Sequence, residues 1–255
     1  KVKEYAQRAL KLDDGSAEAH TSMAIATLFG EWDWKTAEEH VQHAIQLNAG
    51  YSTAHLVYSV ILVTSGRVNL AIEQDRLAMD LDPLSLIVNW NATSTFFLAG
   101  RFDEAIAQAK RTIEIDPTSS LPQGALARTY EQTGRLEEGL EILRQHFSLP
   151  GVPAENRAMV DALIAEYRKG GVAGYWGHML RMELGPNPRN PKDKIRIAMI
   201  YTKLGDKDKA LSYLERAYAE HAGDMIFINV EPSFEPIRRE PRLRALARKV
   251  GIPGA

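Results

Sequence analysis

The sequence STAHLVYSVILVTSGRVNLAIEQDRLAMDLDPLS, residues 52–85, is followed directly by LIVNWNATSTFFLAGRFDEAIAQAKRTIEIDPTS, residues 86–119. Placed one under the other, the two stretches match at a period of 34 residues, so that Gly66 aligns with Gly100 and the two Asp-Pro pairs align as well. A fixed period of this length predicts a repeat architecture, and it takes precedence over any local motif.

Each stretch contains two apolar helical patterns separated by a glycine turn. The small residues Ala71 and Ala105 stand where the two helices of a unit are expected to cross, because only a small side chain lets two backbones approach within about 8–10 Å. Gly66 suits a left-handed helix end, and Pro83 and Pro117 prevent the second helix from continuing. Such a unit cannot bury its apolar faces alone, so the sequence predicts a stack of units.

These features resemble the tetratricopeptide repeat (TPR). The resemblance implies an all-α fold, a right-handed TPR superhelix of helix-turn-helix units, which we expect to end in a C-terminal capping helix. We expect a half-repeat, the second helix of a truncated TPR, at residues 1–16, and four regular-to-degenerating TPR units at 17–148. A divergent helical pair and linker at 149–190, a TPR unit at 191–224 and a capping tail at 225–255 should follow.

The first helix is predicted at Val2–Leu12, and it matches the second helix of a repeat whose first helix is missing. This favours a fragment of a longer protein, with a native half-repeat that acts as a cap as the alternative. In either case, we expect Val2, Tyr5 and Leu12 to be partly exposed, which would allow a homodimer through this truncated helix.

Composition excludes several classes of function. Lys and Arg number 31 against 33 Asp and Glu, for a formal net charge of −2, so nothing global favours nucleic acid. There is no cysteine, and no apolar run reaches the ~18–20 residues of a spanning helix, so we expect no membrane insertion. The motifs of nucleotide-binding and hydrolytic sites are missing, and we expect no enzymatic activity and no cofactor. We expect a cytoplasmic location, with an extracytoplasmic domain of a membrane-anchored regulator as the alternative.

Three other features have a functional and a structural interpretation. His40 and His43 have the spacing of a metal-ligand pair, but the sequence supplies no matching third ligand, so we predict no metal site. Trp32 and Trp34 could stack a ligand, although packing at the turn is the favoured interpretation. The arginines of the tail suit a phosphate group or an acidic partner, but a solvated face paired to nearby carboxylates is favoured.

The concave groove is the predicted binding site. In a TPR the first helices line the inner surface, and residues four and seven positions after each groove-facing residue share one stripe. This selects a partner-binding set consisting of Leu56, Val60, Val63, Trp90, Ser94, Phe97 and Arg128. TPRs that hold a C-terminal carboxylate use Lys, Asn and Arg here; only Asn91 and Arg128 match, so a carboxylate clamp is not favoured.

The predicted function is therefore a protein–protein interaction scaffold or regulatory module, which binds a partner helix or peptide of unknown identity in its groove. The alternative is a small-molecule sensor that uses the groove around Trp90. Three passages, WDWKTAEEHVQHAIQLNAGYSTAH, LDPLS and EPSFEPIRREPRLRALARKVGIP, also resemble the C-terminal TPR regions of multidomain bacterial signalling proteins. That resemblance implies a bacterial regulatory context.

Overall fold

The computed structural model describes residues 1–185 and 193–255, and within these ranges every regular element is a helix and no strand is present. The expectation of an all-α fold is confirmed. The greater part of the expected linker and the first residues of the unit expected at 191–224 lie outside the described residues.

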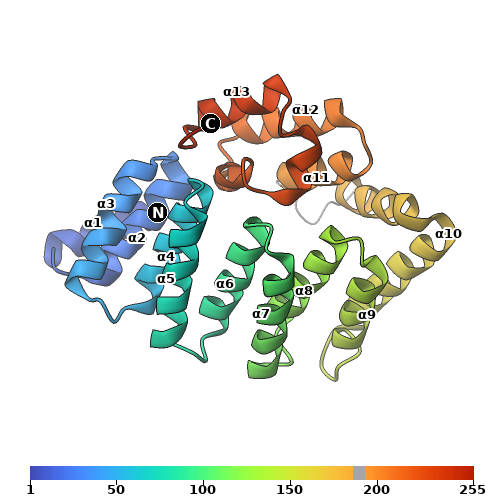
Figure 1. The fold of residues 1–255 in the computed structure, drawn as a ribbon, viewed down its shortest axis with the longest axis horizontal. Coiled ribbons are helices and arrows are strands. Elements are labelled where there is room, and N and C mark those ends of the chain that lie inside the picture. The colour runs from blue at the N-terminus through green and yellow to red at the C-terminus, as the bar shows by residue number, and fades with distance from the viewer. Residues whose placement is uncertain (186–192) are drawn as a thin grey trace.

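The described helices follow one another with short connections (Figure 1). They are α1 (Val2–Leu12), α2 (Ala17–Glu31), α3 (Trp34–Leu47), α4 (Ser52–Thr64), α5 (Val68–Leu81), α6 (Leu86–Leu98), α7 (Phe102–Ile115), α8 (Ser120–Gln132), α9 (Leu136–His146), α10 (Ala154–Leu184), α11 (Lys194–Lys203), α12 (Lys207–Ala219), the short 3₁₀ helices η1 (Gly223–Phe227) and η2 (Pro232–Ile237), and α13 (Pro241–Val250).

The helices pack as antiparallel pairs, α2 with α3, α4 with α5, α6 with α7, α8 with α9 and α11 with α12. The first helices of successive pairs, α2, α4, α6 and α8, also pack against one another. The second helices approach each other less, so the stack curves, and the first helices form its inner layer (Figure 1).

The small residues of the repeat lie where the period predicts them. Ala71 and Ala105 are fully buried, and Gly66 and Gly100 adopt φ of 79° and 71°, the left-handed region that glycine enters without strain. Gly139 replaces the crossing alanine in α9, and a Cβ there would lie 2.9 Å from the carbonyl oxygen of Ala127. The crossing of α8 and α9 is therefore too close for any side chain.

A repeated hydrogen-bond pattern ties each inner helix to the turn before it. Asn89 donates from Nδ2 to the carbonyl of Pro83 at 3.0 Å, and one period later Gln123 donates from Nε2 to Pro117 at 2.7 Å. Gln108 in turn donates to Asn89 at 2.8 Å, which links the two helices of that unit. These side-chain hydrogen bonds join the inner helix to the turn before it in both units and help to fix the register of the repeat.

The region between α9 and α11 contains a helical pair within the range of α10. The backbone leaves the helical region at Gly171, where φ is 60° and ψ is −150°, so two helical segments meet there at a kink. Gly174 allows the kink to close, because a Cβ there would lie 2.4 Å from the carbonyl oxygen of Glu166. Gly171 therefore separates the two helical segments of the pair.

The C-terminal part closes the stack into a ring. The largest hydrophobic core contains Leu28 of α2 and Ile61 of α4 together with Leu214 of α12, Phe234 of η2 and Leu246 of α13. The two ends of the chain therefore share one core, and the C-terminus lies beside the N-terminal helices (Figure 1). The tail was expected to seal one end of an open solenoid, but it joins the first repeats to the last one.

Candidate functional site

Contacts from the C-terminal part reach the inner layer at the C-terminal ends of its helices. At the end of α2, the rings of Phe29 and Phe227 lie 6.2 Å apart, and Nε2 of His221 is 3.0 Å from the carbonyl oxygen of Gly30. At the end of α8, Lys203 donates to the side chain of Gln132 at 2.6 Å. The C-terminal part therefore covers the half of the inner surface that lies nearest the C-terminal ends of the inner helices.

The opposite half of the inner surface remains open. Ile87, in the first turn of α6, is 50% exposed, and Leu121, one period later in the first turn of α8, is 46% exposed. Trp90 and Ser94 follow on α6 and are half-buried, and the hydroxyl of Ser94 donates to the carbonyl of Trp90 at 3.0 Å. We refer to Ile87, Trp90 and Leu121 as the open apolar strip.

The other predicted groove residues are less accessible. Val63 is 1% exposed and Phe97 4% exposed, and both are parts of hydrophobic clusters within the repeats. Leu56 and Val60 are half-buried against the large core that joins the ends of the chain. Among the predicted residues, Trp90 and Ser94 therefore offer accessible surface outside these clusters.

Arg128 is exposed, but its guanidinium is already engaged. It lies over the ring of Phe97, with 4.3 Å from Cζ to the ring centroid, and it forms an ion pair with Glu231 of the tail. The Glu231 side chain is only 2% exposed, and its other oxygen accepts a hydrogen bond from the backbone N–H of Ser233 at 3.0 Å. The carboxylate that Arg128 binds in this structure is the chain's own.

The tail is too deeply buried to act as a displaceable lid. Met225, Ile226, Ile228, Phe234 and Ile237 are all fully buried. Burial of a large apolar side chain contributes about 1.5–3 kcal/mol, so removing these five from the core would cost on the order of 7–15 kcal/mol. That is comparable to the whole stability of an ordinary domain.

Charged groups meet inside the ring beside Arg128. Burial raises the pKa of Glu131, which accepts a hydrogen bond from the hydroxyl of Tyr175 at 2.8 Å. Burial lowers the pKa of Lys203, while the negative charges of Glu131 and Glu231 act in the opposite direction. Two positive and two negative side chains share this space, so the cluster is suited to joining α8, α10 and α11 more than to attracting a charged ligand.

A second polar cluster lies behind the inner layer. Asp75 of α5 is 2% exposed and accepts a hydrogen bond from Nδ2 of Asn91 at 2.8 Å, and the hydroxyls of Ser59 and Thr95 lie beside it. Burial raises the pKa of Asp75 to about 6, and these hydrogen bonds limit the rise. Asn91, considered from the sequence for carboxylate binding, is committed to this buried carboxyl group.

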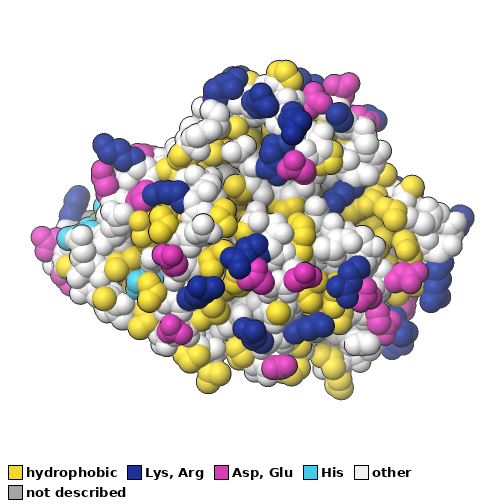
Figure 2. Space-filling view, in the orientation of Figure 1, with side chains coloured by type: hydrophobic (Ala, Val, Ile, Leu, Met, Phe, Trp, Pro, Cys, Tyr) yellow, Lys and Arg dark blue, Asp and Glu magenta, His cyan; other side chains and the backbone are white. Residues whose placement is uncertain are grey.

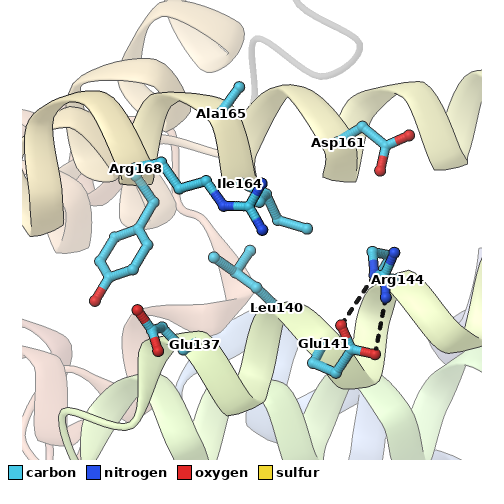
Figure 3. A pocket seen from close by; sticks show the side chains of 9 residues that line it. Glu137, Leu140, Glu141, Arg144, Asp161, Ile164, Ala165 and Arg168 are labelled. Carbon is cyan, nitrogen blue, oxygen red and sulfur yellow. Dashed lines mark hydrogen bonds and ion pairs between the residues drawn. The ribbon is translucent and has the colours of Figure 1, made fainter.

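Two cavities lie away from the open apolar strip. The first, about 530 Å³, separates α9 from α10, and Figure 3 shows Arg168 reaching into it from α10. The guanidinium of Arg144 on its wall donates to both oxygens of Glu141, at 2.9 and 3.2 Å (Figure 3). The second, about 540 Å³, lies between α3 and the C-terminal residues Pro253 and Gly254. Neither of these cavities is lined by Trp90.

The tryptophans and tail arginines take structural positions. Trp34 is buried and donates from Nε1 to the hydroxyl of Thr64 at 3.1 Å, whereas Trp32 stacks on His221 with ring centroids 3.7 Å apart. In the tail, Arg238 donates to Glu235 at 2.6 Å and Arg242 donates to both oxygens of Glu215 at 2.9 Å. Charges of both signs are interspersed over the face shown in Figure 2.

The sequence stripe missed Ile87 and Leu121. Ile87 stands three residues before Trp90, where the stripe began on α6, and Leu121 stands one period after Ile87; residues three apart share one face of a helix. Extending the stripe one turn toward the N-terminus would have found them. No sequence pattern indicated that the C-terminal part of the chain would cover the other half of the inner surface.

Comparison with known proteins identifies the repeats. Tetratricopeptide-repeat families match residues 96–147 and residues 194–219. No curated protein matches the chain.

Among solved structures, the chain is similar to TTC0263, a thermophilic TPR protein of Thermus thermophilus, at 21% identity over 63% of this chain and 87% of that one, with a TM-score of 0.53. It is also similar to pilF of Pseudomonas aeruginosa, at 18% identity over 84% and 96% with a TM-score of 0.52, and to human IFIT1, solved as a dimer with m7Gppp-AAAA, at 16% over 84% and 57% with a TM-score of 0.54. At such identities the likeness shows the fold, and it confirms a TPR solenoid.

Proposed function

We propose that this tetratricopeptide-repeat solenoid is a non-catalytic scaffold that binds a partner helix or extended peptide along the open half of its inner surface. TPR proteins generally mediate protein–protein interaction, and the repeats of this chain are TPR repeats. The groove, and the chemistry of the partner, are proposed from the surface described above.

The observation that supports the proposal is the open apolar strip. Ile87 and Leu121 are one period apart and about half exposed, so stacking of α6 on α8 places them side by side. Trp90 lies one turn further along α6 and does not belong to the repeat clusters around Phe97 or Leu62. Tryptophan is among the residue types most enriched at binding hot spots, and an apolar strip on a helical groove suits the apolar face of a partner helix.

Burial should dominate this interaction. Arg128, the charged member of the predicted set, is paired with Glu231, so no unpaired charge in that set is available to attract a partner. Interactions between exposed charges weaken with salt, whereas burial of apolar surface depends on salt much less. We therefore expect partner affinity to change little between low and moderate ionic strength.

The experiment compares Trp90→Ala and Ile87→Ser with Leu77→Ser, using the partner that co-purifies with the chain. Leu77 is an exposed leucine on α5, in the outer layer, and serves as the matched control. Trp90→Ala should weaken binding by about 2 kcal/mol or more, roughly 30-fold, while Leu77→Ser should leave it unchanged. Equal loss in all three variants, or loss in Leu77→Ser alone, would place the binding surface elsewhere.

We also propose that α1 supports a homodimer, and that the chain is a cytoplasmic regulatory module of the bacterial type. Val2, Tyr5 and Leu12 are exposed on α1. Sedimentation of the wild-type chain against Tyr5→Glu tests the dimer, which the charged variant should dissociate. Among the described residues, no helix combines the length and the apolarity that crossing a membrane requires.

A further inference from the structure

Three histidines meet at the N-terminal end of the stack, away from the inner surface. Nδ1 of His20, in α2, lies 2.9 Å from Nδ1 of His40, in α3. The ring of His43, one turn further along α3, meets the ring of His20 edge to face with centroids 4.5 Å apart. Histidine side chains are visible at this end of the molecule in Figure 2.

The neighbouring repeats show what this position does structurally. His55 contacts Oε1 of Gln74 at 2.7 Å, and Gln108 donates to Asn89 at 2.8 Å. Gln74 and Gln108 follow His40 at steps of 34 residues, so His20–His40 is the first repeat's version of the same link between two helices. Of these three links, the one in the first repeat joins two imidazoles and has a third imidazole against it.

The partners of His20 determine its tautomer. Its Nε2 lies 3.1 Å from the carbonyl oxygen of Asp14, and a carbonyl can only accept, so Nε2 carries the proton. Nδ1 of His20 therefore presents a lone pair, and His40 donates its Nδ1 proton to it. A histidine whose outer nitrogen donates to a backbone carbonyl while its inner nitrogen carries a lone pair matches the pattern of metal-ligating histidines.

We propose that His20 and His40 bind one divalent transition-metal ion of the borderline class, such as Zn²⁺ or Ni²⁺, with His43 as a third ligand. Tetrahedral Zn–N bonds of about 2.0–2.1 Å place two ligand nitrogens about 3.3 Å apart, so the two rings need to separate by less than about 1 Å. His40 changes tautomer, moving its proton from Nδ1 to Nε2, with no change in net charge.

His43 must rotate to complete the site. In the structure as it stands, no group of three or more His, Cys, Asp or Glu residues among those described is arranged to hold a metal. His43 is exposed, so its side chain can turn without breaking a packed core. The metal would take the place between the two Nδ1 atoms that the proton leaves when it moves to Nε2 of His40.

The surrounding charges are mixed. Burial lowers the pKa of His40, and the neighbouring His20, His43 and Lys3 lower it further, while Glu39 raises it. The positive charge of Lys3 disfavours binding of a cation nearby. Lys3 forms an ion pair with Glu31 of α2, however, which offsets part of that charge.

The test is calorimetric titration of the folded chain with Zn²⁺ alone at pH 7.5, on wild type and four variants. His40→Gln recreates the His55–Gln74 pair, and His20→Asn with His40→Gln recreates the Asn89–Gln108 pair, so both should fold. His43→Gln tests the third ligand. His55→Gln is the matched control, because His55 occupies the position of His20 one repeat later and pairs with a glutamine instead of an imidazole.

We expect one equivalent of Zn²⁺ in the wild type and His55→Gln, at least about tenfold weaker binding in His40→Gln, and none in the double variant. His43→Gln should weaken binding by a smaller factor. In the wild type, Zn²⁺ should shift the ¹⁵N resonances of the two Nδ1 atoms, a readout that needs no variant. Absence of saturable binding, or undiminished binding in the double variant, would reduce the His20–His40 contact to the helix-linking hydrogen bond of the other repeats.

Discussion

Arg128 of α8 and Glu231 of the C-terminal tail, 103 residues apart in the sequence, form an ion pair inside the ring. The pair lies where the tail crosses the ends of the inner helices, and the same arginine covers the ring of Phe97. Since the tail takes this half of the inner surface, a partner has the other half, around Trp90. The contact therefore decides which of the predicted groove residues can act in binding.

Glu231→Ala should destabilise the fold. The substitution removes a buried carboxylate that binds Arg128 and accepts from the backbone of Ser233, and it leaves both donors without that partner. Because Arg128 is half exposed and solvent screens its charge, we expect a loss of about 1–3 kcal/mol in urea unfolding. The control is Glu235→Ala, an exposed carboxylate of the same tail, which should change stability by less than about 0.5 kcal/mol. Equal losses of stability in Glu231→Ala and Glu235→Ala would show that the ion pair with Arg128 stabilises the fold no more than an exposed carboxylate does.

Phe234→Ala should affect both ends of the chain. Phe234 is fully buried in the core that contains Leu28 of α2 and Leu214 of α12, and a Phe-to-Ala cavity costs about 3–5 kcal/mol. Hydrogen exchange should therefore show weaker amide protection in α2 as well as in α12. If protection falls only in the C-terminal helices, the two ends do not share one cooperative core.

Asp75→Asn should stabilise the protein above pH 6. The folded-state pKa of Asp75, about 6, lies above its ordinary value of 3.8. The stability of the wild type relative to the variant should therefore be highest below pH 4 and should fall as the pH rises through 6. The difference between the two proteins should change by about 2–3 kcal/mol from pH 4 to pH 8. Asn91 can still donate to the new side chain.

Asp116→Asn should show the opposite dependence of relative stability on pH. Hydrogen bonds from Thr118 lower the pKa of Asp116, so the wild type should gain relative to this variant as pH rises from the acid range. Thermal unfolding across pH measures both. An Asp75 difference that is flat with pH would show that its carboxyl group is not held in an unfavourable charged state.

Gly139→Ala and Gly124→Ala should act in opposite directions. The new methyl at 139 would meet the backbone of Ala127 at the helix crossing, at a cost of about 1–3 kcal/mol. Gly124 lies on α8, where no described atom other than those of its own chain neighbours and nearby helix backbone comes within 4 Å of its Cβ position, and alanine favours a helix over glycine by up to about 1 kcal/mol. Melting temperatures of the two variants test this; a stabilising Gly139→Ala would mean that the crossing is looser than described.

Much of the fold could be predicted from the sequence because its determinants are local. The period placed the glycine turns at Gly66 and Gly100 and the crossing at Ala71, and the pattern of the first helix predicted Val2–Leu12, the bounds that the structure has. The divergent helical pair was also predictable, because Gly171 leaves the helical region with φ of 60° and ψ of −150° and separates two helical segments.

The candidate site was predictable only in part. The stripe rule places Trp90 and Ser94 on the inner side, but it cannot show that Val63 and Phe97 are buried in the hydrophobic clusters of the repeats. Closure of the ring depends on contacts between residues about a hundred or more positions apart, such as Arg128 with Glu231, and no periodic pattern encodes them. Which half of the groove is open was therefore beyond the sequence.

The measurement that tests the central claim most directly is site-specific photo-crosslinking in cells that produce the protein. A photoreactive phenylalanine analogue replaces Ile87, Leu121 or, as the control on the outer face of α5, Leu77. All three positions are exposed, so the fold should tolerate each one. We predict that positions 87 and 121 give adducts with the same partner and that position 77 gives none. Adducts at 77 without adducts at 87 or 121 would contradict binding along the open half of the inner surface.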